Sequence, residues 1–434
     1  MQRSFWKDLA RACCCALLVS FAQAADPPHA YVASSNCLQV YDTSGPIQTA
    51  ALPSAIYPFS IKLSPDNKFL YVADFYNGTN VQVFNASTLA LVATIPGTSL
   101  TSDIAVLPDG SALYLAIWTG TYGGVAIVDT TTNTVAKYMP EASGTPYGIV
   151  ASPDGAYVYV AAGWGYVHVI NTRTRTLETS IPFNPPGYFY PYSGYPSLGL
   201  GITPDGKRLY VPNQDGFVYV VDTTSRSIVA QVNMGGEDWY RSDNVAISAD
   251  GLHAYISREY LSTVTLIDTT TNMVSGQIPI SGPFGIAMTG DGRSAFLASP
   301  GANAVYLINT STNSAVPLAP GCTTPYSVAV PVTRPNVNQY LTLTGLSGKL
   351  ETTPCTPGSI YDVVSTWKNS SATETLTNFY TQIGTLTGGN QLIGFSYSPS
   401  MVGPGATLGA TFRIQLAACK SFNFTINVLG VPFP

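Results

Sequence analysis

An internal repeat is the feature that most limits how this chain folds. Each copy reads as an apolar run ending in an Asp-Gly turn, a Leu-Tyr-Val-like run, a variable loop, a Val-rich run, a Thr-rich turn and an alternating run. In the copy of Asp66 the glycine of the Asp-Gly turn is replaced by Asn67, which also tolerates positive φ. By subtraction of positions, the copies follow one another at 41 to 51 residues, measured between the turn aspartates Asp66, Asp109, Asp154, Asp205, Asp250 and Asp291. A period of about 40 residues with four short strands is typical of one blade of a β-propeller.

The two ends of the repeat region predict one further blade. Residues 30–52 read as the second, third and fourth strands of a copy that lacks its first strand. Residues 325–332 read as a first strand with nothing after it. Joining these segments predicts an all-β, seven-bladed ring closed by one C-terminal and three N-terminal strands, which leaves no open sheet edge at the junction.

The N-terminal segment reads as a signal peptide at residues 1–24. Arg3, Lys7 and Arg11 precede a short apolar run, and the small-x-small triplet at residues 22–24 is typical of a cleavage site. The apolar run is too short to span a bilayer comfortably, which disfavours the alternative of a membrane anchor. We therefore expect a periplasmic, secreted or cell-surface protein with no membrane span in the mature chain.

Four cysteines follow this leader, namely Cys37, Cys322, Cys355 and Cys419. An even number in an exported chain predicts two disulfides. The loops that carry Cys37 and Cys322 emerge on the same side of the composite blade, so we expect these two cysteines to be bonded and to close the ring. Cys355 and Cys419 would then form the second disulfide.

The repeat also carries a family resemblance. The segments PDGKRLYV, LSPDNKFLYVAD and the VVDTT and VIDTT-like runs resemble the YVTN family of β-propeller repeat proteins, over roughly residues 28–334. That family is exported and includes surface-layer and cell-envelope proteins, with lactonases and haem-bearing propellers as distant relatives. The resemblance implies a propeller at residues 25–335, and it leaves the activity open because the matching residues are turn and core positions.

The repeat stops after residue 335, and residues 336–434 contain alternating β-like runs without Asp-Gly turns. This pattern predicts a separate antiparallel β-sandwich, similar to an immunoglobulin domain, with Cys355 and Cys419 linking its early and late strands. The alternative is a tail of strands that packs on the propeller.

The variable loops are rich in aromatic residues, and we expect them to share the face of the ring opposite the Asp-Gly turns. Rings with a polar tip on loops of a rigid frame suit the binding of a protein or polysaccharide partner, here at the cell envelope. The alternative is that the loops pack on one another. The candidate ligand-binding residues are Trp118, Trp164, Tyr188, Tyr190, Tyr192, Tyr195, Trp239 and Tyr240.

The starts of the first strands should line the ring axis. Asp103, Asn244 and Asp243 are oxygen-bearing residues there or beside it, and together they suggest calcium ligands in a lactonase-like hydrolase. We treat that hydrolase as the alternative, and a non-catalytic binding protein without a cofactor as the main prediction. Residues charged at neutral pH are only 10% of the chain and no basic cluster is present, which disfavours nucleic-acid binding.

Overall fold

A computed structural model describes residues 29–35, 37–52, 58–75, 78–118, 123–142, 144–163, 165–182, 199–236, 244–319 and 321–331 of the repeat region. Beyond it, the structure describes residues 341–350, 359–369, 375–386, 391–398, 401–402, 407–415 and 424–433, mostly as backbone. Pro27–Val332 form one compact unit, and the strands after Thr333 belong to another.

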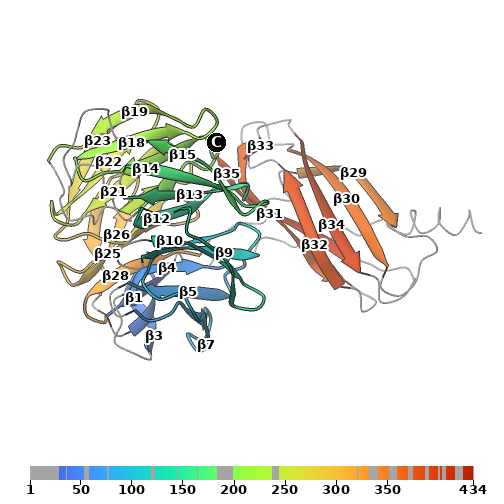
Figure 1. Ribbon diagram of the computed structural model, residues 1–434, viewed down its shortest axis with the longest axis horizontal. Helices are drawn as coiled ribbons and strands as arrows, with labels where there is room; N and C mark the ends of the chain where they lie inside the picture. Colours follow the sequence, from blue (N-terminus) through green and yellow to red (C-terminus); the bar gives the residue numbers. More distant parts are fainter. Residues whose placement is uncertain are drawn as a thin grey trace, which may run out of the picture. The chain divides into compact units, whose positions relative to one another are not determined.

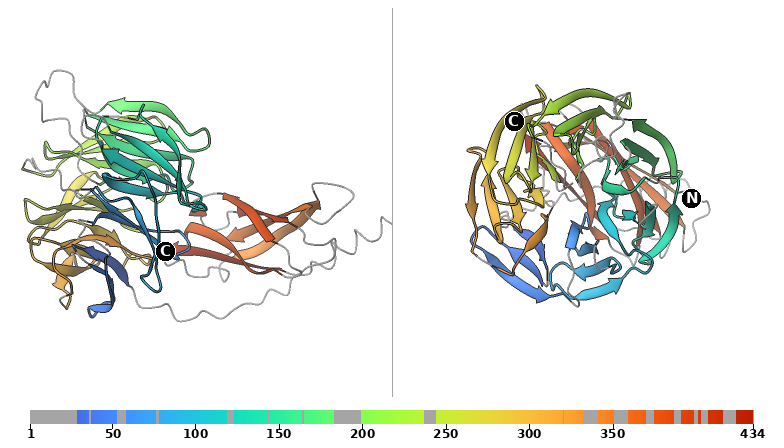
Figure 2. Two further views of the ribbon diagram at one scale, coloured as in Figure 1. Left: turned by 60° about the horizontal axis from the view of Figure 1, so that its bottom comes forward. Right: turned by 60° about the vertical axis from the view of Figure 1, so that its left-hand side comes forward.

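The first unit is a ring of seven four-stranded antiparallel sheets (Figure 1 and Figure 2, right). We number the blades in chain order. Blade 1 contains β4 (Pro58–Leu63), β5 (Phe69–Asp74), β6 (Gln82–Asn85) and β7 (Leu91–Thr94). Blade 2 contains β8 (Thr101–Val106), β9 (Ala112–Trp118), β10 (Gly123–Asp129) and β11 (Thr134–Met139). Blade 3 contains β12 (Pro146–Ala151), β13 (Tyr157–Ala162), β14 (Tyr166–Asn171) and β15 (Thr176–Pro182).

The next three blades repeat this order of strands. Blade 4 contains β16 (Gly201–Ile202), β17 (Arg208–Pro212), β18 (Phe217–Asp222) and β19 (Ser227–Asn233). Blade 5 contains β20 (Asn244–Ile247), β21 (His253–Arg258), β22 (Thr263–Asp268) and β23 (Met273–Pro279). Blade 6 contains β24 (Ile286–Met288), β25 (Ser294–Ser299), β26 (Ala304–Asn309) and β27 (Ser314–Pro317). Buried apolar side chains from the strands of neighbouring blades form clusters between the sheets.

Blade 7 is built from both ends of the ring, as the sequence predicts. Its sheet order is β28-β1-β2-β3, with strands β28 (Pro325–Ala329), β1 (Ala30–Ser34), β2 (Cys37–Tyr41) and β3 (Pro46–Ala51). Tyr31 pairs with Ala329 and Val32 with Val328 across the junction. The predicted closure by one C-terminal and three N-terminal strands is therefore confirmed.

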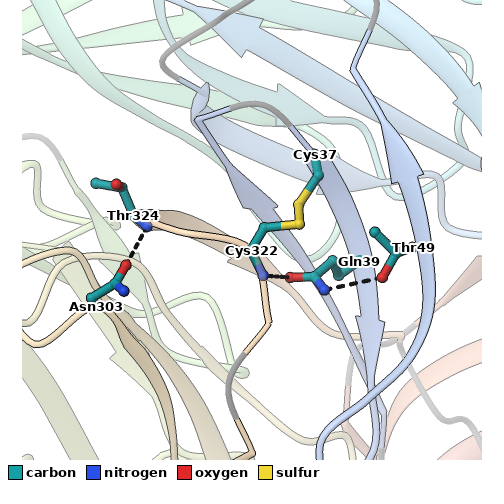
Figure 3. Close-up of a disulfide and its surroundings, with 6 residues drawn as sticks. All are labelled: Cys37, Gln39, Thr49, Asn303, Cys322 and Thr324. Atoms are coloured by element: carbon teal, nitrogen blue, oxygen red, sulfur yellow. Dashed lines mark hydrogen bonds between the residues drawn. A yellow bond between two sulfur atoms is a disulfide. The ribbon is translucent and has the colours of Figure 1, made fainter.

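The predicted disulfide between Cys37 and Cys322 is also confirmed, and Figure 3 shows it beside the hydrogen bonds that fix its surroundings. The Cys322 backbone N–H donates to Oε1 of Gln39 at 2.8 Å, and Nε2 of Gln39 donates to Oγ1 of Thr49 at 3.0 Å. The bond joins residues 285 positions apart and so staples the loop before β28 to the second N-terminal strand.

The Asp-Gly turns form one side of the ring, which we call the constant face. In each of them the residue after the aspartate has positive φ, from 59° at Asn67 to 74° at Gly110 and Gly251. The aspartates accept hydrogen bonds inside the turn, and Asp205, for example, accepts from the Thr203 hydroxyl at 2.6 Å and from the Lys207 N–H at 3.0 Å. These aspartates therefore have a structural role within the turns.

The Thr-rich turns lie on the same face and connect neighbouring blades. In two of them, an asparagine with positive φ accepts a hydrogen bond from a tyrosine of the preceding blade. Asn272 and Asn313 both have positive φ, and their Oδ1 atoms accept hydrogen bonds from the hydroxyls of Tyr210 and Tyr255 at 2.9 and 3.0 Å. Burial raises the pKa of Tyr210 to about 12, so the phenol remains a neutral donor. Tyrosine of one copy and asparagine of the next thus hold neighbouring blades in register.

The second unit contains two antiparallel sheets. One has the order β29-β30-β34-β32, from strands β29 (Leu341–Leu350), β30 (Ile360–Asn369), β34 (Thr407–Gln415) and β32 (Gln391–Ser398). The other has the order β33-β31-β35, from β33 (Met401–Val402), β31 (Thr375–Leu386) and β35 (Phe424–Phe433). The immunoglobulin-like sandwich stays a prediction, and Cys355 and Cys419 lie outside the described residues, as does the predicted signal peptide.

Removing the ring-closing disulfide should lower the stability of the propeller. In the chain-entropy account, a cross-link over so long a loop contributes roughly 2–5 kcal/mol to the free energy of unfolding. We expect that loss in a Cys37→Ser/Cys322→Ser protein, measured by denaturant unfolding of the oxidised proteins. Wild-type protein kept in reductant is the matched control and should show the same loss, whereas an unchanged midpoint would show that the bond does not restrain the ring.

The tyrosine–asparagine contact between blades 5 and 6 can be measured separately. Tyr255→Phe and Asn313→Gly each remove the same hydrogen bond, and each should cost about 1 kcal/mol in the free energy of unfolding. Glycine keeps the left-handed backbone at position 313. The double variant should cost clearly less than the sum of the two single variants, and strict additivity would argue against direct coupling.

Candidate binding face

The face opposite the Asp-Gly turns carries the loops between the second and third strands of each blade and the connections from one blade to the next. We call it the variable face. Trp118, at the end of β9, is the candidate aromatic residue that the structure describes. The other candidate aromatic residues lie outside the described residues, namely Trp164, Tyr188, Tyr190, Tyr192, Tyr195, Trp239 and Tyr240. Asp243, a candidate calcium ligand, also lies outside them.

Several aromatic rings on the variable face pack on one another. The Trp118 ring stacks on Phe75 with centroids 5.3 Å apart, and Phe75 lies 5.4 Å from Phe59. Phe59 in turn meets Phe284 at 5.4 Å, and Phe284 meets Tyr326 at 5.9 Å. This aromatic row runs from blade 2 through blade 1 to blades 6 and 7. Because Phe75 and Phe284 are buried, the row mainly covers the ends of the blades, in agreement with the alternative that the loops pack together.

Two tyrosines on the variable face instead present their rings to solvent. The exposed fraction is 39% at Tyr166, which begins β14, and 55% at Tyr260, in the loop after β21. Leu261 follows Tyr260 and is 40% exposed. Large rings on a rigid frame lose little conformational entropy when they are covered, so these residues are suited to contact a partner.

The carboxylate of Asp103 is engaged by protein donors from three blades. Its Oδ1 accepts from the Ser60 hydroxyl of blade 1 at 2.7 Å and from the Ile104 N–H at 2.8 Å. Its Oδ2 accepts from the Ile149 N–H of blade 3 at 3.0 Å. The half-exposed ammonium of Lys62 lies 3.4 Å from Oδ1. Asp103 is therefore a buried bridge that joins the inner strands of blades 1, 2 and 3.

In other blades, the residues equivalent to Asp103 join the first strands of neighbouring blades in two different ways. Ser327 of blade 7 accepts a hydrogen bond from the Ile61 N–H of blade 1 at 3.1 Å. A Cβ at Gly199 would lie 2.7 Å from the Asn244 Cα, and a Cβ at Gly285 would lie 2.5 Å from the Tyr326 carbonyl oxygen. At these two positions glycine lets the next blade approach closely.

These contacts bear on calcium binding by Asp103 and Asn244, which stays a prediction. The two residues lie in blades 2 and 5, which are not neighbours, and the Lys62 ammonium already occupies the surroundings of the Asp103 carboxylate. Nδ2 of Asn244 is buried and has no hydrogen-bond partner in the described part of the chain. Within the same ranges there is no group of three or more metal-ligating His, Cys, Asp or Glu side chains. This donor set fits a hydrogen-bonded bridge better than a shared cation site.

A further acidic residue lies on the variable face, in the loop between β17 and β18. Oδ2 of Asp215 accepts from the Tyr219 hydroxyl at 2.7 Å, and Oδ1 accepts from the Phe217 N–H at 3.0 Å. Burial raises the pKa of the Asp215 carboxyl despite these hydrogen bonds. Sequence analysis did not single out Asp215, because an Asp-Gly pair between two strands is an ordinary turn signal.

Sequence analysis also missed the polar residues that end the second strands. Asp74, Arg258 and Ser299 occupy this position in blades 1, 5 and 6, and all three are buried. The Ser299 hydroxyl donates to the Ser281 carbonyl, and the Arg258 guanidinium donates to three carbonyls of one connection. Aligning the copies at the Leu-Tyr-Val run would have revealed a polar residue at a buried position.

Comparisons with known proteins agree with the propeller fold. No protein-family model matches the sequence. Over 156 residues, 35% of the chain, the sequence is 30% identical to the seven-bladed beta-propeller protein Rv1057 of Mycobacterium tuberculosis, and the match spans 35% of that relative's length. Among solved structures, the chain is similar to Kuenenia stuttgartiensis hydrazine synthase, with a TM-score of 0.52, 21% identity and coverage of 63% of this chain and 90% of that one. At this identity the likeness concerns the fold alone.

No helix among the described residues is long and apolar enough to cross a membrane.

Replacing Asp103 should destabilise the ring, because the Ser60 hydroxyl and the N–H groups of Ile104 and Ile149 would lose their acceptor. We expect Asp103→Ala to lower the free energy of unfolding by about 1–3 kcal/mol. Lys62→Met removes the exposed ion-pair partner and is the matched control, with an expected cost of at most about 1 kcal/mol. Melting temperatures with calcium and with EDTA should agree, whereas a calcium-dependent increase that Asp103→Ala abolishes would support the hydrolase alternative.

Proposed function

We propose that this protein is an exported, non-catalytic propeller of the YVTN type, and that its variable face binds a protein or polysaccharide of the cell envelope. The observation that carries the proposal is the contrast between the two faces. On the constant face, the side-chain oxygens of turn aspartates and asparagines accept hydrogen bonds within and between blades. On the variable face, Tyr166, Tyr260 and Leu261 leave large apolar surfaces exposed.

The disulfide between Cys37 and Cys322 supports the exported location. Disulfides persist in oxidising compartments and are rare in the cytosol. The predicted signal peptide at residues 1–24 leads to the same location. A seven-bladed frame with a stapled closure also suits an extracellular binding protein, since loops on a rigid scaffold keep their relative positions.

The exposed tyrosines suit the chemistry of both partner classes. Each ring offers an apolar face for the carbon-bound hydrogens of a sugar or for an apolar side chain, and a hydroxyl for a hydrogen bond. The predicted residues Tyr190 and Tyr192 would extend such a surface. Hot spots of binding are enriched in tyrosine and tryptophan, so truncation of a few rings should remove most of the affinity.

Sedimentation with isolated envelope fragments of the source organism tests this proposal. We expect the purified protein to bind the fragments, and Tyr166→Ala/Tyr260→Ala to weaken that binding at least tenfold, as does Tyr190→Ala/Tyr192→Ala. Protease treatment of the fragments distinguishes the two partner classes, because a polysaccharide partner survives it.

Leu252→Ala supplies the control for this experiment. Leu252 is 46% exposed and follows the turn of Asp250 and Gly251 on the constant face. Its truncation removes exposed apolar surface without touching the variable face, so binding should be unchanged. Equal losses from both faces, or no binding by the wild-type protein, would contradict the proposal.

A further inference from the structure

Arg258 ends β21 and is only 1% exposed, although nothing in its position within a β-strand requires a long cationic side chain. Its Nη1 donates to the carbonyl oxygens of Met234 and Gly235 at 3.0 and 2.7 Å, and its Nη2 donates to that of Gly236 at 2.8 Å. These three residues begin the connection from blade 4 to blade 5. A planar guanidinium that holds three successive carbonyls restricts the backbone there to one conformation.

The connection has a matching geometry. Gly235 and Gly236 have φ of 70° and 71°, a region that favours glycine, and the Gly235 N–H donates to Oδ1 of Asn233 at 2.8 Å. The Met234 N–H donates to the Gly216 carbonyl at 2.9 Å, and its side chain is buried. A Cβ at Gly236 would lie 3.4 Å from Leu261, so this segment packs beside the exposed pair Tyr260 and Leu261.

The same position in blade 6 shows what the arginine adds. Val245 pairs with Ile256 and Ile286 pairs with Leu297, so Arg258 and Ser299, each two residues further along the second strand, are equivalent. Ser299 donates to the Ser281 carbonyl in the connection that enters its own blade. By the strand bounds, that connection is residues 280–285, whereas the one that Arg258 holds is longer, at residues 234–243. Arg258 thus holds three carbonyls of the longer connection, whereas Ser299 holds one carbonyl of the shorter connection.

From these contacts we infer that Arg258 is a positioning residue of the variable face. It anchors residues 234–236, which pack beside the exposed pair Tyr260 and Leu261 of the proposed binding face. The binding part of this inference rests on the proposed function, whereas the anchoring part rests on the contacts alone. Arg258 itself is buried and acts through the residues that it holds.

Hydrogen exchange of the full-length protein tests the anchor. Arg258→Met keeps most of the buried volume but leaves three carbonyls without their donor. We expect amide exchange in residues 234–243 to rise at least tenfold, with β20, β21 and β22 unchanged. Arg258→Lys keeps the charge and one donor group, so it should show a smaller rise and also guards against a Met variant that fails to fold. Ser299→Ala is the matched control and should leave residues 234–243 unchanged.

Affinity for the envelope fragments supplies a readout that a purely structural role would not move. At a temperature where all the variants are folded, we expect Arg258→Met to weaken binding several-fold, Arg258→Lys to restore part of it, and Ser299→Ala to have no effect. Unchanged exchange in residues 234–243, or a uniform rise throughout blade 5, would overturn the anchor. Faster exchange with unchanged affinity would overturn the role in binding. If the wild-type protein binds no fragments, the proposed function fails, and the exchange experiment still decides the anchor.

Discussion

Pairing between β28 and β1 is the interaction on which the rest of the propeller depends. These strands come from opposite ends of the ring, and their contact closes a loop of nearly the whole unit. Loop closure of this length is costly in entropy, and a strand pair alone leaves little margin against opening. The disulfide and the hydrogen bond from Cys322 to Gln39 act at the same junction, so the closure is secured by covalent and non-covalent means together.

Closure also determines what the axis can do. Each inner strand must meet the next one without a continuous backbone ladder, and the chain solves this with a bridging side chain at Asp103 or Ser327 and with close approach at Gly199 or Gly285. The Asp103 carboxylate accepts hydrogen bonds from all three of the blades that it joins. The inner strands therefore hold neighbouring blades together near the axis.

The sequence predicted the features that repeat, because a repeated residue reveals its role by recurring in phase. Asp-Gly turns, the four-strand period and the incomplete copies at both ends were enough to predict seven blades, their closure and the pairing of Cys37 with Cys322. The partners of Asp103 were not predictable, since they lie in the preceding and following blades. The burial of Phe75 and the exposure of Tyr260 could not be predicted from the sequence either, because both depend on how neighbouring loops pack. Sequence alone identifies which loops vary and leaves open which rings reach solvent.

The two faces differ in how a substitution propagates. On the constant face a turn residue serves its own blade and its neighbour, as Asn313 does by combining a left-handed backbone with a bond to Tyr255, so a change there disturbs two sheets. On the variable face a connection is held by one side chain from the blade that it enters, as Ser299 and Arg258 illustrate. Neither contact involves the strands β28 and β1 that close the ring, so a change in one of these connections leaves that closure untouched.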